Sequence, residues 1–376
     1  MQPFRVLLIG ATGQFGRRIA AELAGDVVIQ LIVAGRDAAA LATLADALTA
    51  AHPDGGVQTA TVDVSAADLP VRLQALAPQL VIHTAGPFQG QDYHVAEAAL
   101  RAGAHYVDLA DGRQFVAGIG AIDALATSCG RWAIAGASSV PGLSAAVIAA
   151  LLPRFSRLDA VESAISPGNR TERGLATTRA ILGYVGKPYP ALIDGQWQPV
   201  IGWQSLRRMQ IPGCGTRWFA RCEVPDLAIL PQRHPSLRHC DFRAGLELRR
   251  MHLGLWAASW LVRGKLLPSM QPWAAPLLRL SNRWLRAGSD TGVMLIDLRG
   301  LDAAGRPLTL RWRIVADAGS GPQIPATPAV VLARKLARGQ LPGAGAVPCL
   351  DLFTLDDCLD ALRPFPIHTH VDVQPA

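Results

Sequence analysis

Short apolar runs alternate with longer alanine-rich windows over the first 153 residues of the chain. Each run is rich in Val, Ile and Leu, as buried strands are, and each window is long enough for a helix that connects two parallel strands. This pattern predicts an α/β fold with an N-terminal Rossmann domain, which is a doubly wound parallel sheet. The expected strands are 4–9, 27–35, 57–62, 80–85, 105–109 and 131–136, and the expected helices are 14–24, 38–51, 66–76, 91–102 and 113–128.

The pattern changes after residue 153, where Gly and Pro interrupt the chain every few residues. Residues 251–288 predict helices broken by prolines, and residues 291–316 predict two strands joined by a turn at 302–305. An amphipathic helix is expected over 327–340, followed by a loop and a short terminal helix. The expected division is a Rossmann domain over 1–153, a second, α+β domain over 154–326 and a C-terminal helical segment over 327–376, whose packing back on the first domain stays open.

Composition excludes a disordered chain, because half of the 376 residues are hydrophobic and 17% are charged. The six cysteines form no CxxC pair, so we expect neither a disulfide framework nor a metal site. The first apolar run leads directly into a glycine loop and therefore is expected to be a strand, not a signal peptide. Gly or Pro interrupts every long apolar window. We therefore expect a cytoplasmic protein with no transmembrane helix.

The net charge of +7 is unevenly distributed. Residues 201–290 contain 14 Arg and Lys against 5 Asp and Glu, a net of +9, so the remaining residues sum to −2. Seven of the nine tryptophans lie between residues 197 and 284, in nearly the same stretch. The basic surplus therefore belongs to one part of the second domain.

A glycine-rich loop directly follows the first apolar run and directly precedes a helical window. Gly10, Gly13 and Gly16 have the spacing in which the first glycine allows a tight turn, the second lets the backbone approach a diphosphate, and the third lets the helix pack on the strand. The N-terminus of the helix then faces the phosphate charge. This context predicts a dinucleotide site over Gly10, Ala11, Thr12, Gly13, Gln14, Phe15 and Gly16.

The residue type at the end of the second strand distinguishes the two nicotinamide dinucleotides. An acidic residue there accepts from the ribose of NAD, whereas this chain has Arg36, whose guanidinium suits the 2′-phosphate of NADP. We therefore predict NADP as cofactor and favour it over NAD, with Asp37 as the cap of the next helix. Asp63 and Val64, after the third strand, are expected at the adenine, although Asp63 can equally cap the helix that follows.

The expected nicotinamide position is at the end of the fourth strand, where Ala85, Gly86, Pro87 and Phe88 form a turn. No motif distinguishes a catalytic acid, so the catalytic residues stay unknown. Tyr106 and Asp108, which share a strand face, are expected to make buried structural hydrogen bonds. The proton donors expected near this turn are His83, Tyr93, His94, His105, Tyr106, Asp108, Ser138 and Ser139.

These landmarks together resemble the saccharopine dehydrogenase-like NAD(P)-binding oxidoreductase family. The resemblance lies in the glycine loop, in the Gly-Arg-Asp at 35–37, in residues 83–112 and in the Ser/Pro-rich loop at 136–142. It implies an NADP-binding domain, a substrate domain and hydride transfer to an imine, a carbonyl or an activated double bond. The chain departs from the family where Ala110 and Asp111 replace a Gly-Glu pair and where the loop at 136–142 lacks an acidic residue. We therefore expect a substrate other than saccharopine.

Two classes of function follow from these observations. The first is an NADP-dependent oxidoreductase that acts on a small-molecule or acyl-chain carbonyl, imine or enoyl substrate. The alternative is a non-catalytic NADP-binding sensor or scaffold. No nucleic-acid partner is expected because the aromatic residues follow no recognition motif, and the formation of a homodimer stays open.

The Trp- and Arg-rich residues 251–288 allow three interpretations. They pack the second domain, line an apolar substrate channel, or contact a membrane surface peripherally. Packing is the default, and the sequence alone does not decide between the other two.

Overall fold

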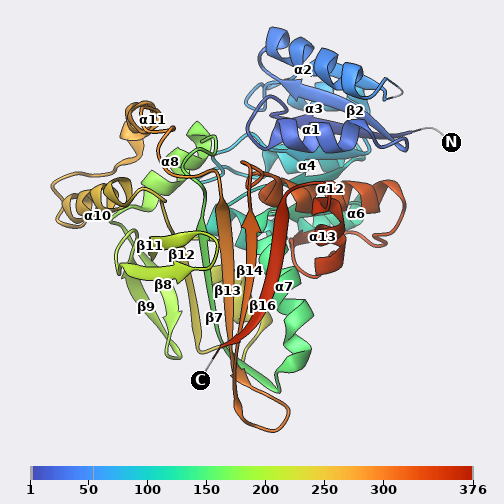
Figure 1. The fold of residues 1–376 in the computed structure, drawn as a ribbon. Coiled ribbons are helices and arrows are strands. Elements are labelled where there is room, and N and C mark those ends of the chain that lie inside the picture. The colour runs from blue at the N-terminus through green and yellow to red at the C-terminus, as the bar shows by residue number, and fades with distance from the viewer. Residues whose placement is uncertain (1–2, 54, 375–376) are drawn as a thin grey trace. The chain divides into compact units, whose positions relative to one another are not determined.

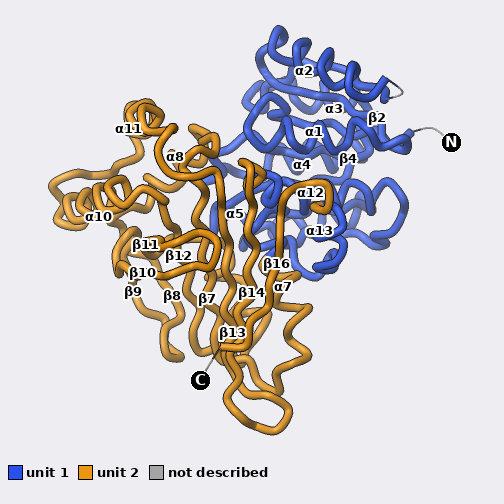
Figure 2. The backbone as a smooth tube through the Cα atoms, viewed as in Figure 1, with its two compact units in different colours: residues 1–143, 322–361 blue, residues 144–321, 362–376 orange. Residues whose placement is uncertain are grey.

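The computed structural model describes residues 3–53 and 55–374, which divide into two compact units (Figures 1 and 2). Unit 1 comprises residues 1–143 and 322–361, and unit 2 comprises residues 144–321 and 362–376. Each unit is therefore assembled from two separate stretches of the chain.

Unit 1 contains a seven-stranded parallel sheet in the order β3-β2-β1-β4-β5-β6-β15, which confirms the predicted Rossmann fold. The first six strands have the order of a dinucleotide-binding sheet. The strands are β1 (Phe4–Ile9), β2 (Ile29–Gly35), β3 (Val57–Thr61), β4 (Leu80–His83), β5 (His105–Asp108), β6 (Trp132–Ala135) and β15 (Gly345–Pro348). The helices are α1 (Gly16–Ala24), α2 (Ala38–Ala51), α3 (Leu69–Leu76), α4 (His94–Arg101), α5 (Arg113–Ala117), α6 (Asp123–Ser128), α12 (Gln323–Ala337) and α13 (Leu355–Leu362).

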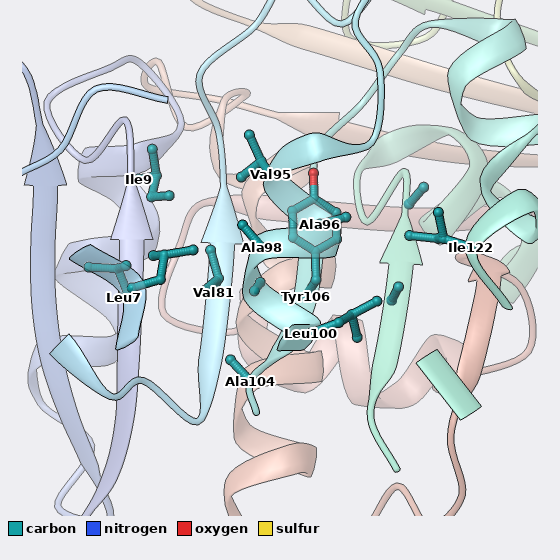
Figure 3. Packing of buried hydrophobic residues seen from close by; sticks show 14 of the residues in the cluster. Leu7, Ile9, Val81, Val95, Ala96, Ala98, Leu100, Ala104, Tyr106 and Ile122 are labelled. Atoms are coloured by element: carbon teal, nitrogen blue, oxygen red, sulfur yellow. The ribbon is translucent and has the colours of Figure 1, made fainter. Parts of the chain in front are cut away.

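The core of unit 1 explains why its strands are nearly continuous apolar runs. Parallel strands are covered by helices on both faces, so neither face of the sheet requires polar residues. On one face, Leu7, Val81 and Tyr106 of three neighbouring strands pack with Val95 and Leu100 of α4 (Figure 3). The only polar atom among the side chains drawn there is the hydroxyl of Tyr106, at the end of its ring (Figure 3).

Two of the expected helices in unit 1 differ from the prediction. The window 113–128 is not one helix but α5, a short 3-10 helix over Ile119–Ile122, and α6. Gly118 ends α5 where the hydroxyl of Tyr93 donates to the carbonyl of Phe115 at 2.7 Å, and a Cβ at Gly118 would lie 2.8 Å from that hydroxyl. The helix expected from residue 66 begins at Leu69, because the chain first makes a turn around Asp63.

The sequence pattern predicts a helical C-terminal segment over 327–376, but the segment is only partly helical. It contains α12 and α13, but also β15, which pairs with β6, and a final strand, β16 (Ile367–Gln374), which belongs to unit 2. β15 has only four residues and forms by pairing with β6, whereas β16 alternates β-branched and polar residues, a strand pattern that the prediction of a helical segment overlooked.

Unit 2 is built on a mixed nine-stranded sheet whose main path is β10-β11-β12-β7-β13-β14-β16, with β8 and β9 attached through β12. The two strands expected within 291–316 are present as β13 and β14. The remaining strands are β7 (Arg157–Ser166), β8 (Pro188–Ile193), β9 (Gln196–Ile201), β10 (Arg207–Ile211), β11 (Gly215–Arg221), β12 (His239–Ala244), β13 (Gly292–Leu301) and β14 (Pro307–Ala316). The helices are α7 (Ser144–Leu151), α8 (Leu175–Tyr184), α9 (Asp226–Arg233), α10 (Arg249–Arg263) and α11 (Ala274–Asn282).

Candidate dinucleotide-binding site

The carboxyl ends of the central strands of unit 1 lie level with one another. In the register of the sheet, Ile9 pairs with Ala34 of β2 on one side and with His83 of β4 on the other, and His83 pairs with Asp108 of β5. The loops that follow these strands therefore leave the same edge of the sheet. Because β1 lies between β2 and β4, this edge includes the point where the strand order reverses, and ligands of such sheets bind at that point.

The glycine loop is shaped by close contacts at its first and third glycines. Gly10 has a φ of +81°, and a Cβ there would lie 2.6 Å from Oγ1 of Thr84. A Cβ at Gly16 would lie 2.2 Å from the carbonyl oxygen of Gly10, so only glycine lets α1 begin this close to β1. These two glycines are required by the packing of the protein itself.

The middle of the loop is open. Thr12 and Gly13 are exposed, and a Cβ at Gly13 would meet only the carbonyl oxygen of Gly10, at 3.1 Å. The N-cap residue of α1, Phe15, has no side-chain acceptor for the first amides, and no acidic residue lies in the first turn. This end of the helix favours a bound anion. The cradle therefore fits the diphosphate of a dinucleotide, with Ala11 buried beneath it and Gln14 partly buried at its rim.

Arg36 is exposed and directly follows β2. Its neighbour Asp37 is the N-cap of α2 and accepts from the amide of Ala40 at 3.0 Å, as predicted, so it is engaged in the fold. Hydrogen bonds from the hydroxyl and amide of Ser65 lower the pKa of Asp63, and the positive charge of Arg36 lowers it further. Arg36 and Asp63 therefore lie near each other at the ends of adjacent strands.

The turn at 85–88 is held in place by two side chains that the sequence did not single out. Oγ1 of Thr84 donates towards the carbonyl oxygens of Ile9, at 2.9 Å, and Gly10, at 3.1 Å. The side-chain amide of Gln91 donates to the carbonyl oxygens of Ala85, at 3.3 Å, and Pro87, at 2.7 Å. These contacts join the turn to the glycine loop. The sequence offers only a weak indication of this role, which is that both are polar residues flanking a Gly-Pro turn.

The last residue of this turn, Phe88, points into the core. Its side chain is 4% exposed and packs edge-on against His83, with ring centroids 5.1 Å apart, and against Phe115 at 5.4 Å. Phe88 therefore anchors the turn, and its backbone, not its ring, is available to a ligand. In contrast, Ala85, Gly86 and Pro87 are partly exposed.

Three polar side chains are buried beneath the turn at the ends of β4 and β5. Nδ1 of His83 lies 3.1 Å from the hydroxyl of Tyr106, and Oδ1 of Asp108 accepts from the amides of Ala110, at 2.9 Å, and Gly136, at 2.8 Å. Burial lowers the pKa of His83 to about 4 and raises that of Asp108 to about 7, so both are largely neutral in the folded chain near pH 6. Burial also raises the pKa of Tyr106. Each of the three is at most 1% exposed.

The other expected proton donors are dispersed. His105 is the first residue of β5, so it lies at the opposite edge of the sheet, where its Nδ1 accepts from the amide of Trp132 at 2.9 Å. Its expected place near the turn is therefore wrong. The hydroxyl of Tyr93 is engaged with Phe115, while Ser138 and Ser139 lie in the loop after β6, partly and fully buried respectively.

His94 connects the loop after β3 with the N-terminus of α4. Its Nε2 lies 2.7 Å from the carbonyl oxygen of Val64, and its Nδ1 contacts the carboxylate of Asp92. Burial opposes the charged ring, but the hydrogen bonds with Asp92 and Val64 outweigh it and raise the pKa of His94. The loop that contains Asp63 and Val64 is thus tied to α4, beside the turn at 85–88.

Comparison with known proteins agrees with this geometry. Residues 6–128 match the family described as the saccharopine dehydrogenase NADP binding domain. A comparison with curated protein sequences found no match.

Solved structures extend the likeness to both units. The chain is similar to apo histidine-tagged saccharopine dehydrogenase (L-Glu forming) from Saccharomyces cerevisiae, with 15% identity and a TM-score of 0.69 over 99% of this chain and 100% of that one. It is also similar to amine dehydrogenase from Mycobacterium smegmatis, with 13% identity and a TM-score of 0.50 over 92% and 94% of the two chains. At these identities the likeness concerns the fold. The family match therefore covers residues 6–128, and the likeness of fold covers both units.

Proposed function

We propose that the protein is an NADP-dependent oxidoreductase that transfers hydride to a carbonyl, imine or enoyl group. The observation that carries the proposal is the glycine loop, whose open middle at Gly13 faces the uncapped N-terminus of α1 at the carboxyl edge of the sheet. Arg36 adds an exposed positive charge at the end of β2. The domain family of residues 6–128 supports the same cofactor class.

In this proposal, different residues bind different parts of the cofactor. The backbone amides of the loop Gly10–Gly16 would hold the diphosphate, and the guanidinium of Arg36 would bind the 2′-phosphate. Asp63 and Val64 would lie beside the adenine, and the turn at 85–88, which Thr84 and Gln91 hold in place, would orient the nicotinamide. When bound, the reduced cofactor supplies a hydride.

The substrate class is an electrophilic carbon at an imine, a carbonyl or an activated double bond. The names of the two similar structures, a saccharopine dehydrogenase and an amine dehydrogenase, favour the imine within this class. We propose a substrate other than saccharopine, because that tricarboxylic amino acid needs several aimed cations and the loop at 136–142 offers none.

Replacing Arg36 by Ala tests the cofactor assignment. The Kd for NADPH is expected to rise about 10- to 100-fold, because about 1.5–3 kcal/mol of charged hydrogen bonding to the 2′-phosphate is lost. The Kd for NADH should change little, since NADH lacks that phosphate. Fluorescence titration of the full chain with each nucleotide measures both constants.

Arg101→Ala is the matched control. Arg101 is an exposed arginine of the same unit at the C-terminus of α4, paired with Glu97 on its own helix. Its replacement should leave both constants unchanged. A wild-type protein that prefers NADH, or equal losses in the two variants, would contradict the assignment of Arg36.

A non-catalytic NADP-binding sensor is the second candidate. It is favoured by the burial of His83, Tyr106 and Asp108, which leaves no acid of that cluster exposed at the sheet edge. Oxidation of NADPH by the full chain, followed across ketoacids, imines and enoyl esters, separates the two. Tight NADPH binding with no turnover of any member of these series would favour the sensor.

A further inference from the structure

The chain between Glu247 and Asp290 contains seven basic residues and no acidic one. It includes α10, the 3-10 helix Gln271–Trp273 and α11, and the name α10–α11 surface is used below for the exposed side of residues 249–286. The basic residues are Arg249, Arg250, Arg263, Lys265, Arg279, Arg283 and Arg286. In contrast, arginines of the unit 2 sheet such as Arg221, Arg243 and Arg311 form ion pairs with acidic residues.

The exposed side of α10 has apolar residues between the arginines at its two ends. Gly254, Ala257, Trp260 and Leu261 recur at the spacing of one helix face, and all four are exposed. Trp260 is 47% exposed and Leu261 is 43% exposed. A helix in water normally presents charged residues along its whole outward side, whereas the exposed positions of α10 between Arg250 and Arg263 are apolar.

Exposed apolar side chains also occur in the segment that follows α10 and in α11. Leu266 is 75% exposed, Trp273 is 51% exposed and Leu280 of α11 is 41% exposed. Trp273, Pro276 and Leu280 follow one another at helical spacing, so they lie on one side. Five of the eleven large hydrophobic side chains exposed in the described part of the chain therefore fall within residues 260–280.

These apolar residues lie outside the hydrophobic cluster beneath α10 and α11. The inner sides of α10 and α11 are already occupied by a hydrophobic cluster that includes Trp203, Val262, Met270 and Ala274. The guanidinium of Arg263 lies over the ring of Trp260, 4.8 Å from its centroid. Figure 1 shows α10 and α11 at the margin of unit 2, outside its sheet. The outer side of α10 and α11 is therefore exposed on helices that are firmly packed against the rest of unit 2.

Positive charge and exposed apolar side chains together indicate which kind of partner binds the α10–α11 surface. A second copy of the chain would bring seven uncompensated positive charges against seven more, which is unfavourable at short range. An anionic bilayer offers both required features, because tryptophan rings are favoured at the headgroup level and arginines reach the phosphates while their stems cover apolar surface. No helix within residues 3–53 and 55–374 is long and apolar enough to cross a bilayer.

We propose that the α10–α11 surface binds the face of anionic lipid bilayers, with Trp260, Leu266 and Trp273 inserted at the headgroup level. The interaction is peripheral and reversible. It is independent of the proposed oxidoreductase activity, since residues 249–286 belong to unit 2 and the dinucleotide site belongs to unit 1.

Co-sedimentation of the full chain with phosphatidylcholine vesicles, with and without about a third of phosphatidylglycerol, tests the proposal. The chain is expected to bind the anionic vesicles and to be released at 1 M salt, where the Debye length falls to about 3 Å. Charge reversal at Arg279 and Arg283 should weaken partitioning by about fivefold or more for each arginine. Trp260→Ser with Trp273→Ser should weaken it about tenfold.

Matched controls separate the surface from general charge and hydrophobicity. Trp197→Ser removes a tryptophan that is 53% exposed in β9, and Arg208→Glu reverses an exposed arginine in β10, both in unit 2 but outside the surface. Neither should change partitioning by more than about twofold. Circular dichroism and thermal unfolding confirm that every variant is folded.

Fluorescence quenching measures how deeply the tryptophans insert into the bilayer. Brominated lipids should quench part of the tryptophan fluorescence of the wild type, and this quenching should be smaller in the double Trp→Ser variant. Equal binding to neutral vesicles, equal losses in the control variants, or the absence of vesicle binding would overturn the proposal. Sedimentation velocity distinguishes the remaining case, because a dimer abolished by Trp260→Ser would assign the surface to a second copy of the chain.

Discussion

Three glycines of the candidate site are glycine for different physical reasons. Gly10 needs a positive φ, and Gly16 lies too close to the backbone of Gly10 to carry a side chain. Gly86 has neither constraint, because a Cβ there would meet the ring of Phe88 at 3.4 Å and its backbone nitrogen at 3.7 Å, both ordinary contact distances. Its lack of a side chain is therefore not explained by the packing of unit 1, and the proposed nicotinamide contact explains it.

Replacing Gly86 by Ala should leave the free energy of unfolding within about 0.5 kcal/mol of wild type, as for a substitution without a clash. The Kd for NADPH should rise about tenfold or more, since a methyl group then occupies space reserved for the ligand. Denaturant unfolding and nucleotide titration measure the two effects.

Gly16→Ala supplies the contrast. Its Cβ would overlap the carbonyl oxygen of Gly10, so we expect a loss of stability of about 1–3 kcal/mol even without nucleotide. If Gly86→Ala instead loses stability and keeps its affinity for NADPH, the turn at 85–88 is a structural feature only.

The buried carboxyl of Asp108 makes stability depend on pH. Its pKa is about 7 in the folded chain against an ordinary 3.8, so between these values the unfolded chain is ionised while the folded chain is protonated. Raising the pH through this window therefore favours unfolding, by up to about 1.4 kcal/mol per pH unit for one group. The buried His83 acts in the opposite sense, because its pKa falls to about 4 on folding.

Asp108→Asn isolates this contribution, because the amide oxygen can still accept from the amides of Ala110 and Gly136. The stability of the variant relative to wild type should rise as the pH increases from about 4 to 7. Chemical denaturation at pH 5 and pH 7 measures the change, and the contribution of His83 cancels because both proteins contain it. A pH-independent difference would place the carboxyl in its ordinary ionised state.

At the scale of elements, the last strand of the parallel sheet depends on one side chain far away in sequence. Oδ1 of Asp123, at the start of α6, accepts from the amide of Ala346 at 2.8 Å, beside the pairing of β15 with β6. Gly345 has a φ of +147°, and a Cβ there would lie 2.9 Å from the same oxygen. The strand is thus fixed by a long-range contact, not by its own residues.

Asp123→Ala should lower the free energy of unfolding by about 1 kcal/mol, because it removes the acceptor that holds β15. Asp123→Asn keeps the acceptor and should recover most of the loss. Asp46→Ala, at an exposed position of α2, is the control for removing a surface carboxylate. A loss in Asp46→Ala as large as that in Asp123→Ala would show that the contact does not stabilise the strand.

Elements with strong local periodicity were predictable and those made by a partner were not. The prediction of β1 was correct at both ends, and α2 was likewise correct over 38–51. In contrast, β15 has only four residues and forms by pairing with β6, and the strict alternation of β16 was overlooked when 327–376 was expected to be helical. The break at Gly118 also escaped prediction, since the hydroxyl of Tyr93 that occupies the space comes from another element.

At the scale of the whole molecule, the chain leaves unit 1 at residue 143 and returns to it at residue 322. After α12 and β15 complete unit 1, the last residues cross back to supply β16 to unit 2. The most basic stretch of the sequence folds into helices whose exposed side combines arginines with Trp and Leu side chains.

The Rossmann sheet, the glycine loop and the position of Arg36 were predictable from the amino-acid pattern, because buried parallel strands and their connecting turns depend on local apolar runs and on glycine spacing. Which polar groups meet at the sheet edge became known from the fold. The bracing of the turn by Thr84 and Gln91, the burial of His83 beside Tyr106 and the displacement of His105 to the far edge all follow from strand register. Register joins residues that are distant along the chain, so no local pattern contains it.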